Sequence, residues 1–153
     1  MSTPTERLAA LGLELPPVAA PVAAYAPATA SGNLVMTSGQ LPTVAGHLVA
    51  IGKVGGDVTP EQATDAARIA ALNALAAAAS VAGGLDNIAR IVKATVFVAS
   101  TPDFTGQPQV ANGASQLFVD VFGDAGQHVR SAVGVPVLPL DAPVEIELTV
   151  EPA

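Results

Sequence analysis

Residues 59–84 read TPEQATDAARIAALNALAAAASVAGG, which is the clearest secondary-structure element in the sequence. Thr59 suits an N-cap, Pro60 suits the first helical position, and Gln62 completes a capping box. The glycine pair that ends the stretch supplies a C-terminal stop. Because the side chains of such an alanine-rich helix are small, the sequence predicts that the helix packs very close to a β-sheet.

Strand-like segments lie on both sides of this helix. Alternating or β-branched residues predict strands over 86–100, 128–135 and 143–152. Two earlier strands are predicted to stop at glycines: residues 33–42 hold a strand that ends at Gly39, and residues 47–57 hold a shorter strand that ends in a glycine turn. A second helix is predicted from about Pro108 to Val121, with an apolar stripe on one face. No internal repeat interrupts this order of strands, helix, strand, helix and strands. The sequence therefore predicts an α+β fold in which one sheet carries two main helices on one face.

Residues 1–24 are predicted to add a short helix and an extended arm to this core. The helix is predicted over 3–13, where a threonine can cap it and a proline fits its first position. The proline- and alanine-rich segment that follows predicts an arm laid on the surface, which becomes an edge strand near Tyr25. The whole chain, residues 1–153, is therefore predicted to be a single domain with its core over 25–152.

Charge is scarce in this chain. Of its 153 residues, 50% are apolar and 12% are charged, against about 25% charged in typical soluble domains. A monomer would have a poorly charged surface, so the composition favours an assembly in which apolar surface meets other subunits. The formal net charge of −7, with no two basic residues adjacent, argues against nucleic acid and against an anionic membrane surface as partners.

Two residue types are too rare to carry common chemistries. The sequence has no cysteine, which excludes disulfides, thiol catalysis and cysteine–metal sites. Its two histidines, His47 and His128, are too few for a histidine-rich site, so we expect no metal. The N-terminus lacks the pattern of a signal peptide, and the alanine-rich run is too weakly apolar for a membrane span. We therefore expect a cytoplasmic protein.

Alternation along the last two strands separates two faces. On the last strand, the face expected under the helices is apolar and the other is polar, with Val144, Ile146, Leu148 and Val150 against Glu145, Glu147, Thr149 and Glu151. On the preceding strand, Arg130 shares a face with His128 and Ala132. We expect Arg130 to lie on the polar sheet face, beside glutamates of the neighbouring strand.

This arrangement leaves two interpretations of Arg130. The first is a cross-strand ion pair with a glutamate on a solvated face, which is common on strands. The second is a pocket in which the guanidinium binds a ligand carboxylate, while a nearby glutamate positions or activates a water. An acidic protein with six basic residues would need such a fixed arginine to hold an anion.

Five stretches carry a family resemblance. In order along the chain they are YAPATASGNLVMTSGQLP, VKATVFVAS, VANGASQLF, VRSAVGV and PVEIE. Together they resemble the Rid/YjgF family of reactive-intermediate enamine/imine deaminases, also known as the endoribonuclease L-PSP family, from about Tyr25 to Glu151. The resemblance rests on their order and spacing. It implies a chorismate-mutase-like fold with a single mixed sheet, assembled as a homotrimer with pockets at the subunit interfaces.

The resemblance also implies roles for six residues. Arg130 would bind the substrate carboxylate, and Glu145 would place the hydrolytic water. The other four would line the pocket: Tyr25, Ser38, Gly39 and Asn112. On the residues alone, Tyr25 could equally anchor the arm, and Asn112 could fix the second helix. No cofactor is implied, because imines are already electrophilic.

The chain departs from the family pattern near Arg130. The stretch before it reads QHV, where typical members have a Pro–Ala pair, and Ala132 stands where they have a cysteine. Residues 105–108 resemble an insertion, and the N-terminal helix and arm are additional. These differences are typical of a longer-chain subgroup.

Two functions from different classes follow from the resemblance. The first is a hydrolase that converts 2-imino or 2-enamino acids to 2-keto acids and ammonia, with the carboxylate held by Arg130 and water placed by Glu145. The second is a non-catalytic module that binds small carboxylates such as keto acids. Ribonuclease activity, suggested by the older family label, is disfavoured because the sequence has no basic patch and no convincing histidine pair.

Overall fold

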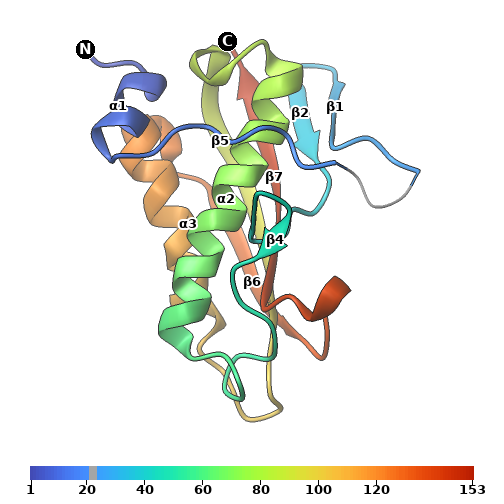
Figure 1. The fold of residues 1–153 in the computed structure, drawn as a ribbon. Helices are drawn as coiled ribbons and strands as arrows, with labels where there is room; N and C mark the ends of the chain where they lie inside the picture. Colours follow the sequence, from blue (N-terminus) through green and yellow to red (C-terminus); the bar gives the residue numbers. More distant parts are fainter. Residues whose placement is uncertain (21–23) are drawn as a thin grey trace.

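A five-stranded mixed sheet forms the centre of the fold (Figure 1). The computed structural model describes residues 1–20 and 24–153, so residues 21–23 of the predicted arm lie outside the described residues. The strands of the sheet are β1 (Ala28–Ser31), β2 (Leu34–Thr37), β5 (Ile88–Ala99), β6 (Val129–Val135) and β7 (Val144–Pro152). Their order across the sheet is β1-β2-β7-β5-β6. The sheet is mixed because β5 and β6 run parallel while the other neighbours run antiparallel.

Two long helices cover one face of this sheet (Figure 1). They are α2 (Pro60–Ala82) and α3 (Gln107–Phe122), and both match the predicted helices closely. The predicted N-terminal helix is α1 (Pro4–Ala10), which packs against α3. Short 3-10 turns connect the elements: η1 (Leu85–Asn87), η2 (Gly123–Gly126) and η3 (Pro139–Asp141). The chorismate-mutase-like α+β fold expected from the sequence is confirmed.

The capping interactions predicted for both ends of α2 are present in the structure. The Thr59 hydroxyl accepts a hydrogen bond from the Gln62 backbone N–H at 3.1 Å, and the Gln62 side chain accepts one from the Thr59 N–H at 2.9 Å. This capping box satisfies backbone donors that the first turn of a helix leaves free. At the other end, Gly83 takes a left-handed conformation with φ 97°, which closes the helix.

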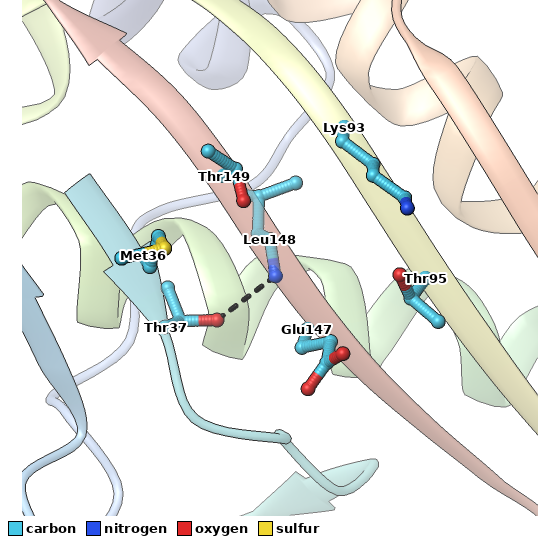
Figure 2. A pocket seen from close by; sticks show the side chains of 7 residues that line it. All are labelled: Met36, Thr37, Lys93, Thr95, Glu147, Leu148 and Thr149. Carbon is cyan, nitrogen blue, oxygen red and sulfur yellow. Dashed lines mark hydrogen bonds between the residues drawn. The ribbon is translucent and has the colours of Figure 1, made fainter. Parts of the chain in front are cut away.

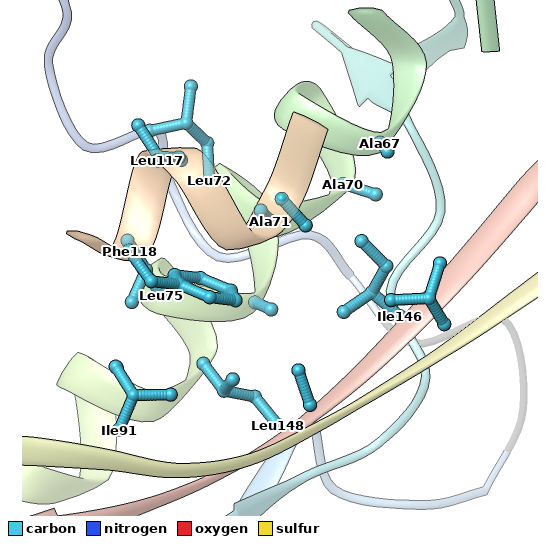
Figure 3. Packing of buried hydrophobic residues seen from close by; sticks show 14 of the residues in the cluster. Ala67, Ala70, Ala71, Leu72, Leu75, Ile91, Leu117, Phe118, Ile146 and Leu148 are labelled. Atoms are coloured by element: carbon cyan, nitrogen blue, oxygen red, sulfur yellow. The ribbon is translucent and has the colours of Figure 1, made fainter. Parts of the chain in front are cut away.

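Small side chains bring α2 close to the sheet, and larger side chains fill the space around them (Figure 3). Ala67, Ala70 and Ala71 are fully buried near Ile146 of β7. Other members of the same cluster are Leu72, Leu75, Ile91, Leu117, Phe118 and Leu148. By length and composition α2 could cross a membrane, but 72% of its most apolar 18-residue window is buried inside the fold, as in a core helix.

The alternation predicted for β7 is confirmed. Its four apolar residues, Val144, Ile146, Leu148 and Val150, are all buried on the helix side. Glu145, Glu147 and Thr149 point to the other face, which none of the helices in residues 1–20 and 24–153 covers (Figure 1). We refer to this second face as the open face of the sheet.

Two predicted strands are shorter than expected. Of residues 47–57, only His47–Leu48 forms a strand (β4), and it pairs with β3 (Thr43–Val44) in a separate hairpin. The predicted glycine turn is present, with Gly52 and Gly55 at positive φ values of 123° and 94°, but the strand before it already ends at Leu48. The edge strand expected near Tyr25 begins later, at the first residue of β1.

A close contact between α2 and α3 depends on Gly113. A Cβ atom added at this position would lie 2.1 Å from the backbone carbonyl oxygen of Thr64. That separation is far below van der Waals contact, and the obstacle is backbone that cannot rotate away. The absence of a side chain at residue 113 therefore sets how closely the two main helices approach.

We predict that Gly113→Ala destabilises the protein by about 1–3 kcal/mol, because the new methyl group forces the helices apart. Helix propensity alone favours alanine over glycine by about 1 kcal/mol, so the expected effect has the opposite sign. Urea unfolding would measure the free energy of unfolding, with Gln109→Ala on the exposed side of α3 as the control. A Gly113→Ala protein as stable as wild type would contradict the close contact.

Candidate functional site

The six residues singled out by sequence fall into two groups on opposite faces of the sheet. Arg130 of β6 is in register with Ala94 of β5, which is in register with Leu148 of β7. Both of these partners are buried on the helix side, so Arg130 lies on that side as well. Glu145 lies on the open face, in register with Phe97. The expectation that Arg130 lies beside the glutamates is therefore wrong.

The reason lies in the strand order. β5 separates β6 from β7, so no glutamate of β7 is a direct neighbour of Arg130. Alternation within one strand says which residues share a face, but the register between strands decides which face that is. The parallel β5–β6 pairing puts Arg130 and Ala132 on the same side as α3.

The first group consists of Asn112 and Arg130, which the structure brings into contact on the helix side. The Arg130 Nη1 atom donates to Asn112 Oδ1 at 2.8 Å and to the Ser115 hydroxyl at 3.2 Å. Both acceptors are neutral, so neither cancels the charge of the guanidinium. In residues 1–20 and 24–153, ion pairs join Lys53 to Asp141 and Arg90 to Glu151, and Arg130 has no carboxylate partner.

The second group lies around Glu145 at the open face. A Cβ atom on Gly39 would lie 2.5 Å from the Glu145 Oε2 atom, so the carboxylate occupies space that a larger residue would need. The Ser38 hydroxyl donates to the Ala26 carbonyl oxygen at 2.6 Å, which fastens the segment that follows Tyr25 beside this site. The Tyr25 side chain itself is exposed.

The environment of Glu145 changes its acidity. Partial burial raises the pKa of the Glu145 carboxyl above its ordinary value of 4.5, and the negative charge of Glu147 raises that pKa further. A carboxyl that retains its proton at higher pH can exchange protons with a reacting group more readily near neutrality. Glu145 is thus suited to general acid–base work, with Gly39 beside it.

A shallow hollow with a volume of about 260 Å³ lies on the open face (Figure 2). Its lining residues come from β2, β5 and β7, and they are Met36, Thr37, Lys93, Thr95, Glu147, Leu148 and Thr149. The Leu148 backbone N–H donates to the Thr37 hydroxyl at 3.0 Å and ties β2 to β7 here (Figure 2). None of the six predicted site residues lines this hollow. In the described part of the chain, no three His, Asp or Glu side chains converge as metal ligands.

Two further residues join the Arg130 group. The Ser115 hydroxyl lies 2.9 Å from His128 Nε2, so a chain of hydrogen bonds links His128 to Arg130. Ser115 was not predicted, although it follows Asn112 by three residues and such pairs share a helix face. His128 was placed on the face of Arg130 by alternation, but nothing in the sequence indicated that Ser115 connects them.

Several known proteins are similar to this chain in sequence and in fold. Residues 5–151 match the family described as "YjgF/chorismate_mutase-like, putative endoribonuclease". Protein TCP17 of Trypanosoma cruzi is 44% identical over 144 residues, which cover 92% of this chain and 89% of that protein.

Two solved structures are also similar. The crystal structure of Atu1372 from Agrobacterium tumefaciens is 46% identical, with a TM-score of 0.90, over 98% of this chain and 92% of that chain. The crystal structure of E. coli TdcF with bound serine is 28% identical, with a TM-score of 0.65, over 91% of this chain and 94% of that chain.

We predict that Glu147→Gln lowers the pKa of Glu145, because the repulsion between the two carboxylates is removed. The pKa of Glu145 should still stay above 4.5, because the carboxyl remains partly buried. The Cδ chemical shift of Glu145, followed by NMR across pH, measures this. Glu151→Gln, on the same strand but paired with Arg90, is the control and should leave the titration unchanged. A Glu145 titration identical in wild type and Glu147→Gln would refute the coupling.

The same shift has a consequence for stability. A carboxyl with a higher pKa in the folded state binds its proton more tightly there than in the unfolded chain. Its contribution to stability therefore falls as pH rises from 4.5 through the raised folded-state pKa. Glu145→Gln, which cannot ionise, should lose this part of the pH dependence in thermal unfolding measurements.

Proposed function

Because the chain belongs to the YjgF/chorismate-mutase-like family, we propose that it hydrolyses 2-imino or 2-enamino acids to 2-keto acids and ammonia. The observation that carries this proposal is the state of Arg130. Its guanidinium is held by two neutral side chains and has no carboxylate partner among the described residues. An arginine fixed in place with its charge uncompensated is suited to bind the carboxylate of a small acid.

The two groups of site residues favour an assembly in which each copy supplies half of a site. Within one chain, Arg130 and Glu145 lie on opposite faces of the sheet, so a single small molecule cannot contact both. A site that uses both residues requires Arg130 with Asn112 from one copy and Glu145 with Gly39 from another. We propose a homotrimer, in which three such pairs would form at the three subunit contacts.

The proposed reaction needs only water and proton transfers. Arg130 would orient the substrate through its carboxylate, which places the imine carbon near a water held by Glu145. Glu145 would accept a proton from this water as its oxygen bonds to the imine carbon, and would then return the proton to nitrogen. Glu145 would next take the hydroxyl proton of the resulting carbinolamine and deliver it to nitrogen, so that the C–N bond breaks, ammonia leaves, and the carbon becomes the carbonyl of the keto acid. No metal or organic cofactor is required, because an imine carbon is already electrophilic.

The alternative is a module that binds small carboxylates without turnover. TdcF, which has the same fold, is described with bound serine, an amino acid that carries a carboxylate. Such binding needs Arg130 and its surroundings but no acid–base residue. The two functions therefore differ in whether Glu145 matters for more than affinity.

An imine-trapping assay distinguishes them. An amino-acid oxidase would generate 2-imino acids in the presence of semicarbazide, which traps them as semicarbazones. The proposed enzyme would reduce semicarbazone formation, and Arg130→Ala and Glu145→Gln would each abolish this effect. Wild-type protein that leaves semicarbazone unchanged with several amino acids, but still binds keto acids, would establish the binding module instead.

Mixed assemblies test whether two copies share one site. We predict that Arg130→Ala and Glu145→Gln, each inactive alone, regain about a quarter of the wild-type rate when mixed in equal amounts and reassembled. That fraction is expected because an intact site needs a chain with Arg130 beside a neighbour with Glu145. The control is the double variant mixed with either single variant, which should stay inactive. Mixtures of the two single variants without activity would show that both residues act from one chain.

A further inference from the structure

A continuous chain of hydrogen bonds ends at Arg130 on the helix side of β6. His128 Nδ1 lies 2.7 Å from the Gly126 carbonyl oxygen, and its Nε2 lies 2.9 Å from the Ser115 hydroxyl. Ser115 is in turn 3.2 Å from Arg130 Nη1. Most of this hydrogen-bond chain is partly buried, and two of its members, Ser115 and His128, have no role in the binding or catalysis described above.

The direction of each hydrogen bond follows from the groups involved. A carbonyl oxygen can only accept, so His128 Nδ1 carries a proton and donates it to Gly126. In the neutral ring, Nε2 is then an acceptor and receives the hydroxyl proton of Ser115. The Ser115 oxygen keeps its lone pairs for the N–H of Arg130. His128 thus turns the Ser115 hydroxyl into an acceptor for the guanidinium.

Packing holds the histidine ring in this orientation. His128 meets the edge of Phe118 with ring centroids 5.4 Å apart and an interplanar angle of 84°. Phe118 is fully buried in the core. Gly126 also packs tightly against the backbone of α3, because a Cβ atom at that residue would lie 2.2 Å from the Phe118 backbone oxygen. The start of the hydrogen-bond chain is therefore anchored to the core.

The hydrogen bonds leave one side of the guanidinium available. Arginine has five N–H donors, and both partners of Arg130, Asn112 and Ser115, bind Nη1. The Nε and Nη2 donors have no partner in the described part of the chain, and together they form the planar fork that binds a carboxylate through two hydrogen bonds. An ion pair with a carboxylate of the protein would also have oriented Arg130. It would, however, have neutralised the positive charge that attracts the ligand carboxylate.

We infer that Ser115 and His128 are positioning residues that orient Arg130 for a ligand carboxylate. This inference rests on the proposed function, since it concerns the same carboxylate-binding arginine. One of the two residues, His128, lies in the QHV stretch that departs from the family pattern. The two residues do not touch the substrate; they restrict the guanidinium to one orientation before a ligand arrives.

Ligand binding tests the inference directly. The probes are pyruvate and its neutral amide, measured by calorimetry with wild type, Ser115→Ala, His128→Ala and His128→Gln. Both alanine variants should weaken pyruvate binding by about threefold to tenfold, the usual range for one neutral hydrogen bond, and leave amide binding unchanged. Glutamine can accept from Ser115 and donate to Gly126, so His128→Gln should restore pyruvate affinity. His47→Ala, which changes the exposed histidine of the β3–β4 hairpin, is the control.

A second measurement separates orientation from general damage to the fold. In the ligand-free protein, NMR signals of the Arg130 Nη protons report how freely the guanidinium rotates. Rotation should be slow in wild type and His128→Gln, and faster in Ser115→Ala and His128→Ala, at unchanged melting temperature.

The possible outcomes distinguish this inference from the proposed function. If the alanine variants bind pyruvate as wild type does, or if their guanidinium rotates no faster, the positioning role is refuted and the proposed function stands. If both probes lose affinity equally, the variants have damaged the fold and the positioning role is also refuted. If wild type does not bind pyruvate through Arg130, the carboxylate site fails and the inference fails with it.

Discussion

The close packing of the alanine-rich helix α2 against the sheet determines which faces of the other elements remain accessible. Because Ala67, Ala70 and Ala71 have very small side chains, α2 lies directly over β7. The apolar side chains of β7 are buried in this contact. A sheet with one face buried in this way leaves its polar side chains on the other face or at its edges. The residues available for chemistry are accordingly found at the open face and along the edge strand β6.

Local patterns in the sequence predicted the elements that depend on local physics. The capping box of α2 and the alternation of β7 concern neighbours along the chain, and both are as predicted. Within 47–57, the glycine turn is as predicted, but the strand before it covers only His47–Leu48. The prediction of the sheet face that carries Arg130 was wrong, because alternation within one strand says nothing about the register between β5 and β6.

In the candidate site, too, some features were predicted from the sequence and others were not. Family resemblance identified Asn112 and Arg130, which are in contact, and Gly39 and Glu145, which are also in contact. It gave no indication that the two pairs lie on opposite faces, because a list of residues has no geometry. Ser115 and His128 become recognisable only when the loop after α3 brings the start of β6 back to the helix. His128, which lies in the stretch that departs from the family pattern near Arg130, therefore has a defined hydrogen-bonding partner in Ser115.

The position of β7 also bears on how the chain folds. This strand follows β6 in the sequence, yet it lies in the middle of the sheet, between β2 and β5. The pairs β1–β2 and β5–β6 are joined into one sheet only through β7, which is also the strand that α2 contacts most. Because β2 and β5 are far from β7 in the sequence, formation of the sheet depends on non-local pairing. Before β7 pairs, the facing edges of β2 and β5 are open to other chains, so its insertion also protects the protein against edge-to-edge association.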